Sequence, residues 1–212
     1  MELTHFGHSC LMASVPGTAV LFDPGNFSHG FDGLTGLAAI LVTHQHHDHA
    51  DPDRLPALVE ANPHAALYAD RQTAALYGPP WQALRPGDAL DIGAFHVRAV
   101  GGLHGVIHPD LPVVDNISFL VGDGEHPAKL MHPGDALFNP GEPVVVLGTP
   151  VGGPWMNIAE SVNFLRAVAP EHAVPIHHGM VDPSARGIYY GRLTEFTDID
   201  LRPLEVEQSA VF

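Results

Sequence analysis

A dense group of potential metal ligands lies in one stretch of the first quarter of the chain. His44, His46, Asp48 and His49 directly follow a strand-like apolar run. Alternate residues of an extended chain point to the same side, so His44 and His46 can hold one ion together. Once the chain has turned toward the next helix, Asp48 and His49 can face a second ion close by. Imidazoles and a carboxylate without a thiolate suit Zn²⁺, with Mn²⁺ or Fe²⁺ as alternatives.

Histidine is abundant throughout the chain, with 16 among 212 residues. Imidazole is the commonest metal ligand in proteins and also titrates near neutrality. The alternative interpretation of the run is a polar loop of solvated histidines, but the density of ligands directly after a strand favours metal binding. Histidines without such spacing are expected to be solvated or part of the core. They are His5, His29, His64, His96, His108, His126 and His172.

Short runs of branched and apolar residues between turn signals predict the strands that position these ligands. We expect strands over residues 2–6, 10–15, 19–23, 38–43, 66–69, 95–100, 116–121, 128–132, 144–148 and 173–176. Asp51 and Pro52 supply a cap and a first helical residue for a helix that ends near Ala61. The apolar spacing within residues 157–168 predicts an amphipathic helix. Many short strands with a few helices predict packed sheets that are covered by helices.

Length and composition indicate one globular domain over residues 1–212. Hydrophobic residues make up 45% and charged residues 16% of the chain. Nine Lys and Arg stand against 24 Asp and Glu, which gives a formal net charge of −15, and Lys129 is the single lysine. A surface that follows phosphates needs clustered basic residues, so the composition excludes a nucleic-acid partner.

The chain has no apolar stretch near the roughly 18 residues that cross a bilayer, so no membrane span is expected. It begins without the basic and apolar regions of a secretory signal. Its single cysteine, Cys10, cannot form an internal disulfide and is expected to be a small core residue. Together these features favour a cytoplasmic location.

Five further motifs carry a family resemblance. They are Phe6-Gly7-His8-Ser9-Cys10, Leu21-Phe22-Asp23-Pro24, Gly101-Gly102-Leu103-His104, Met131-His132-Pro133-Gly134-Asp135-Ala136 and Val174-Pro175-Ile176-His177-His178-Gly179. With the His-x-His-x-Asp-His run, they resemble the metallo-β-lactamase superfamily over almost the whole chain. The branch is similar to single-domain metal-dependent hydrolases, the ascorbate-6-phosphate lactonase and N-acyl-phosphatidylethanolamine phospholipase D relatives. The resemblance implies an α/β fold, an αββα sandwich of two mixed sheets with helices outside.

The resemblance also implies a centre of two divalent metal ions, with zinc as the favoured metal. The implied ligands are His44, His46 and His104 for one ion, Asp48, His49 and His177 for the other, and Asp135 between them. Such a centre uses a bridging hydroxide, with Asp48 and Asp135 as catalytic carboxylates, to hydrolyse an ester, lactone, amide or phosphodiester of a small molecule. The alternative is a non-catalytic protein that binds metal and keeps the fold.

The chain departs from the family pattern at two positions. Ala136 stands where Thr is usual, and His178 stands where an aromatic residue is usual. Either His177 or His178 is therefore open as the last ligand, and His177 is favoured because it directly follows Pro-Ile. Adjacent residues of an extended chain point to opposite sides, so only one of the two is expected to bind metal.

Four residues are expected to lie around the ligands as supporting or substrate-contacting groups: His8, Asp23, His132 and His178. Asp23 is expected to orient a ligand histidine through its second ring nitrogen. Its alternative role is that of a turn residue before Pro24. His8 either faces the site or caps a strand, and His132 is a candidate for lining the pocket.

Overall fold

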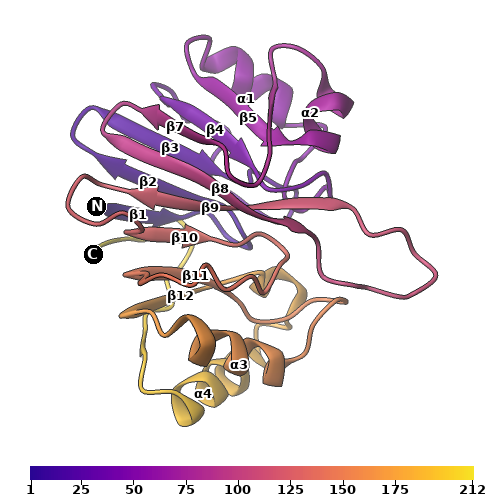
Figure 1. Ribbon diagram of the computed structural model, residues 1–212, viewed down its shortest axis with the longest axis vertical. Helices are drawn as coiled ribbons and strands as arrows, with labels where there is room; N and C mark the ends of the chain where they lie inside the picture. The colour runs from indigo at the N-terminus through magenta and orange to yellow at the C-terminus, as the bar shows by residue number, and fades with distance from the viewer.

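The computed structural model describes residues 1–212. The chain forms two seven-stranded sheets that pack face to face. Figure 1 shows helices on the outer face of each sheet. One sheet is covered by α1 (Leu55–Ala61) and α2 (Arg71–Tyr77), and the other by α3 (Ile158–Val168) and α4 (Arg186–Phe196). This arrangement confirms the predicted αββα sandwich.

The first sheet is formed largely by the N-terminal part of the chain. In spatial order its strands are β14 (Ser209–Val211), β1 (Glu2–His5), β2 (Leu11–Val15), β3 (Thr18–Phe22), β4 (Ala39–Val42), β5 (Ala66–Asp70) and β6 (Gln82–Leu84). The pairs from β14 to β3 are antiparallel and those from β3 to β6 are parallel. The sheet is therefore mixed, as predicted.

The second sheet is formed mainly by the C-terminal half. In spatial order its strands are β13 (Asp200–Leu201), β12 (His172–Ile176), β11 (Val146–Pro150), β10 (Leu130–His132), β9 (Asp115–Gly122), β8 (Phe95–Leu103) and β7 (Ala89–Ile92). The pairs from β7 to β10 are antiparallel and those from β10 to β13 are parallel. This sheet is also mixed.

Successive side chains of a strand point to opposite faces of the sheet and so enter separate layers of the core. In β4, Ala39 and Leu41 belong to the core between the sheets, whereas Ile40 and Val42 belong to the core beneath α1 and α2. Both faces of this strand are buried, which explains its continuous apolar sequence. Full burial stabilises each of the larger side chains by about 1.5–3 kcal/mol. This packing fixes the strand end from which the histidine run begins.

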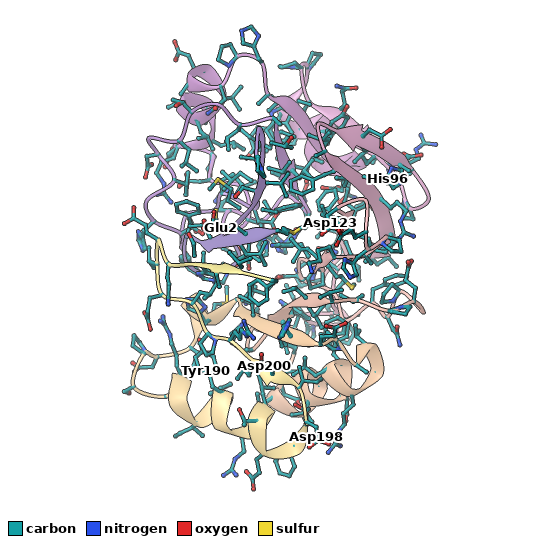
Figure 2. All side chains as sticks on the ribbon, turned by 90° about the vertical axis from the view of Figure 1, so that its left-hand side faces the viewer. Glu2, His96, Asp123, Tyr190, Asp198 and Asp200 are labelled. Carbon is teal, nitrogen blue, oxygen red and sulfur yellow. The ribbon has the colours of Figure 1, made fainter.

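The two ends of the chain meet in the first sheet. Glu2 of β1 pairs with Val211 of β14, and Figure 2 shows the labelled strand of Glu2 beside the C-terminal strand. Further along, the backbone N–H of His5 donates to Gln208 O at 3.0 Å. Because β1 leads directly into the loop that carries His8, the C-terminal strand also fixes the start of that loop.

The first helix begins three residues later than predicted, at Leu55 rather than Pro52. Asp51 caps a turn instead of the helix. Its Oδ1 accepts the backbone N–H groups of Asp53 and Arg54 at 2.9 and 3.2 Å, and its Oδ2 accepts from Arg54 Nε at 2.5 Å. The predicted start of α3 is confirmed, because Asn157 caps that helix.

Several elements were not predicted: α2, α4, β6, β7, β13 and β14. Leu193 is the one buried residue of α4, so the apolar pattern that would indicate a helix is weak there. β13 has only two residues. None of the helices combines the length and apolar character needed to pass through a bilayer.

Candidate metal centre

The predicted ligands meet at one edge of the sandwich, where several strands end. His44 to His49 follow β4, His104 follows β8, Asp135 follows β10 and His177 follows β12. Within each of two clusters, the possible ligand atoms all lie within 4.8 Å of one another. The first cluster is His44, His46, His104 and Asp135, and the second is His8, Asp48, His49 and His177.

Asp135 lies between the two clusters. Its Oδ1 is 3.0 Å from Nε2 of His49, and its Oδ2 is 3.2 Å from Nε2 of His104 and 3.1 Å from Nε2 of His177. The carboxylate is almost completely buried. One side chain thus faces imidazoles of both clusters, which is the position of a carboxylate that can contact two ions.

The atoms that face the centre fit a bound cation. Nε2 of His49, His104 and His177 and Oδ1 of Asp135 are buried and make no hydrogen bond, although each nitrogen lies close to a carboxylate oxygen. A buried polar atom without a partner costs about 1–3 kcal/mol. Divalent cations would give these nitrogens and oxygens a common partner.

The opposite ring nitrogens are held by oxygen atoms. Nδ1 of His49 lies 2.6 Å from Asp23 Oδ2, Nδ1 of His104 lies 2.6 Å from Gly105 O, and Nδ1 of His177 lies 2.5 Å from Gly152 O. Carbonyl and carboxylate oxygens only accept, so each Nδ1 carries a proton and donates it. In the neutral ring, Nε2 then presents its lone pair to the centre, as metal-binding histidines require.

Asp23 supports both clusters from behind. Its oxygens accept hydrogen bonds from Thr43 N at 2.8 Å, from Thr43 Oγ1 at 2.8 Å and from His49 Nδ1 at 2.6 Å. Thr43 Oγ1 in turn accepts from His44 Nδ1 at 3.0 Å. One fully buried carboxylate therefore orients His49 directly and His44 through a hydroxyl group.

The carboxylates and imidazoles of the centre shift each other's protonation. Burial alone would raise the pKa of Asp48 and Asp135, but neighbouring histidines outweigh burial and hold both pKa values well below the usual range. Burial alone would lower the pKa of His177, but Asp135 and Asp48 raise it to about 9. Asp135 and Asp23 likewise raise the pKa of His49. Without metal, protonated His49 and His177 provide the positive charge that a cation would bring.

His44 and His46 behave in the opposite way. Burial and then the neighbouring His49 hold the pKa of His44 well below its ordinary value. Burial and then His104 lower the pKa of His46. Both rings are therefore neutral near pH 7, the state in which imidazole binds metal.

His8 lies within the second cluster, but both of its ring nitrogens already form hydrogen bonds to the protein. Its Nδ1 accepts the backbone N–H of Gly179 at 3.2 Å, so the proton of the neutral ring is on Nε2. That Nε2 donates to Asp48 Oδ2 at 3.0 Å. The carbonyl oxygen of His8 also accepts from His177 N at 2.9 Å. His8 therefore has no free lone pair for a metal ion and connects Asp48 to the loop of His177.

The structure separates His177 from His178. His177 has a left-handed backbone, with φ of 59°, and its ring faces the centre. His178 begins a short 3₁₀ helix (η1, His178–Met180), and its ring stacks on His5 with 5.0 Å between ring centres. Burial lowers the pKa of His178 to about 4. The reversal of backbone direction at His177 thus places only the first of the two histidines among the possible ligands.

His132 lies behind the centre and lines none of the cavities beside it. Its fully buried ring donates from Nε2 to Ser9 O at 2.8 Å and accepts the N–H of Gly134 at Nδ1, at 3.3 Å. The buried ring therefore fits the supporting role among the two expected of it, and not that of a substrate contact. The ring instead joins the N-terminal loop to the turn before Asp135.

Sequence reasoning missed two contributors to the centre. The ring of Trp155 lies 5.8 Å from the ring of His104 and 5.9 Å from that of His177, and no spacing pattern indicated it. A Cβ atom on Gly25 would lie 1.8 Å from Asp48 O, so only glycine allows this close approach. The Asp-Pro-Gly sequence at residues 23–25 was the available signal for the second contributor.

Comparison with known proteins relates this geometry to a family. A family model described as a beta-lactamase superfamily domain matches residues 2–177. The Mycobacterium tuberculosis protein Rv0786c is 63% identical over 212 residues, with 100% of both chains covered. A UPF0173 metal-dependent hydrolase of Salinibacter ruber is 26% identical, with 86% of this chain and 87% of the relative covered. The structure of Igni18, a metallo hydrolase of Ignicoccus hospitalis, matches with a TM-score of 0.75 at 19% identity, covering 100% of this chain and 97% of that chain.

Proposed function

The chain belongs to the beta-lactamase superfamily, and from this premise we propose that it is a metal-dependent hydrolase with a centre of two divalent ions. The observation that carries the proposal is the set of buried ring nitrogens that converge on both sides of the Asp135 carboxylate. The relative named as a metal-dependent hydrolase supports the enzyme class.

The proposed ligands divide between the two ions. His44, His46 and His104 would hold the first ion, and Asp48, His49 and His177 would hold the second, with Asp135 contacting both. His8 is left out because its ring donates to Asp48 rather than to the centre. Imidazole and carboxylate donors without thiolate favour Zn²⁺, and Mn²⁺ or Fe²⁺ also suit them.

Bound ions would supply a nucleophile from water and polarise the oxygen of the scissile group. The protein's own residues hold the geometry for this chemistry. Asp23 fixes the ring of His49, and the carbonyl of Gly152 fixes the ring of His177. The carboxylates of Asp48 and Asp135 lie at the centre and are ionised near pH 7, the state in which carboxylates bind cations and in which an oxygen is open to a proton from the attacking water.

The proposed reaction is hydrolysis of a small-molecule ester, lactone, amide or phosphodiester. No separate serine or cysteine nucleophile is required, because metal ions supply the same stabilisation of developing negative charge. The competing proposal, a metal-binding protein without activity, shares the same ligands and differs only in turnover.

The test combines metal content with turnover. Purified protein is stripped with a chelator, reloaded with Zn²⁺, Mn²⁺ or Fe²⁺, and assayed on p-nitrophenyl acetate and bis(p-nitrophenyl) phosphate. We expect close to two ions per chain and hydrolysis that disappears with the metal and in His46→Ala. Bound metal without turnover would favour the non-catalytic alternative, and protein that takes up no metal would refute both.

A further inference from the structure

A cavity of about 180 Å³ opens directly beside the first cluster. Two of its lining residues, His46 and His104, are proposed ligands. The other side of the cavity is formed by apolar residues between β8 and β9, among them Ile107, Leu111 and Val113. Anything bound there would contact the ligands of the first ion and an apolar wall at once.

The apolar wall belongs to one loop, residues 104–114, which we name the flap. Figure 1 shows this connection between β8 and β9 reaching away from the body of the molecule. Its base is held by a backbone hydrogen bond from His104 to Val114 O at 3.1 Å and another from Gly105 to Asp135 O at 2.7 Å. The flap is therefore fixed to the same residue that lies between the two clusters.

Four apolar side chains of the flap are exposed to solvent. The exposed fractions are 58% for Val106, 40% for Ile107, 53% for Leu111 and 41% for Val113. A group of neighbouring exposed apolar residues often marks a binding surface. Because these residues lie beside His46 and His104, they can contact a substrate bound at the metal centre.

Apart from the proposed metal ions, this cavity offers no positive charge to an anionic group. No Lys or Arg lines it, and the chain carries a formal net charge of −15. A cavity beside the second cluster, by contrast, is lined by His8, His178 and Arg186 among others. Apart from the metal ions, a phosphate-bearing substrate would find a positive side chain, Arg186, in that cavity and none at the flap.

We propose that the flap cavity binds the apolar acyl group of an uncharged ester, lactone or amide, with the scissile carbonyl over His46 and His104. This inference rests on the proposed hydrolase function and specifies its substrate class. A cavity of about 150 Å³ is known to accept benzene. The flap cavity is of similar size, so an acyl chain of about six carbons fits it.

The first test measures how kcat/KM depends on acyl length. The metal-loaded protein is assayed on p-nitrophenyl acetate, butyrate and hexanoate, with bis(p-nitrophenyl) phosphate as the anionic comparison. Burial of methylene groups should raise kcat/KM by up to about fourfold for each added carbon. We expect a rise from acetate to hexanoate and lower activity on the phosphodiester.

A matched pair of variants locates the effect. Val113→Asn places an amide on the flap, and Val211→Asn makes the same change on β14, where Val211 is 72% exposed. Val113→Asn should lose most of the gain from acetate to hexanoate, so that its ratio of kcat/KM on hexanoate to kcat/KM on acetate falls toward one. Val211→Asn should behave as wild type. Equal rates on all esters in the wild type, or an equal loss on all esters in Val113→Asn, would overturn the inference.

The second test does not depend on turnover. 1-Hexanol is titrated into the protein, and the methyl signals of Ile107, Leu111, Val113 and Val211 are followed by NMR. Signals of the three flap residues should shift, and the signal of Val211 should not. Unshifted flap signals would overturn this inference even if esters are hydrolysed. Shifted flap signals without any hydrolysis would support the cavity and refute the proposed function instead.

Discussion

In metal-free protein, the pKa of His177 predicts a loss of stability between pH 6.5 and pH 9. The ring lies 3.1 Å from Asp135 Oδ2 and 3.4 Å from Asp48 Oδ2, and these carboxylates raise its pKa from an ordinary 6.5 to about 9. A group whose pKa is higher in the folded state stabilises that state fully below its unfolded pKa. The contribution is lost as pH rises through the folded value.

The size of the effect follows from the shift. One pKa unit corresponds to about 1.4 kcal/mol, so the contribution of His177 to the free energy of unfolding is roughly 3 kcal/mol. His49 adds to the loss in the same direction, because its pKa is also raised. Buried rings with a lowered pKa, such as His44, change stability in the opposite direction, because an unfolded ring with a pKa of 6.5 is still half-protonated at pH 6.5. Each such ring adds about 0.4 kcal/mol of stability by pH 9.

The assay is urea unfolding of chelator-treated protein at pH 6.5 and pH 9, followed by circular dichroism. Relative to His177→Gln, wild-type protein should lose roughly 2.5 kcal/mol of stability from pH 6.5 to pH 9, because the His177 ring is still half-protonated at pH 9. His177→Gln has no titrating ring and should show a clearly smaller difference. The same change of stability with pH in the wild type and in the variant would refute the assignment of a proton to His177.

Three further outcomes are expected. Asp23→Asn should weaken metal binding by about tenfold to a hundredfold, because it removes the charge that orients a ligand ring; competition with a chelator measures this, and unchanged affinity would contradict it. His8→Ala should lower the affinity for one ion only, since its ring holds Asp48 in place, so equal weakening of both ions would argue against that role. Metal loading should change the fluorescence of Trp155 in a Trp81→Phe background, because its ring contacts a ligand ring from each cluster; an unaltered emission spectrum would be inconsistent with this placement.

Much of the fold followed from local patterns in the sequence. The continuous apolar run of β4 has both faces buried, and the cap at Asn157 starts α3 where the pattern predicts. Residues that follow apolar strands, such as His104 and Asp135, come together because those strand ends meet at one edge of the sandwich. The helix α4 escaped prediction because Leu193 alone is buried on it.

The supporting contacts of the site could not be predicted, because they join distant parts of the chain. His8 meets Gly179 across 171 positions of sequence, and that contact decides which ring nitrogen carries the proton. His132 meets Ser9 across 123 positions, which places it behind the centre rather than in a pocket. Ligand type and spacing are local properties, whereas the direction of a supporting hydrogen bond depends on the completed fold.

The most direct test of the central claim is anomalous diffraction at the zinc absorption edge from crystals of zinc-loaded protein. We expect two peaks about 3.5–4 Å apart, one on each side of the Asp135 carboxylate. The second peak should be in contact with His177 and not with His178. A single peak, or a peak bound by His178, would contradict the proposed centre.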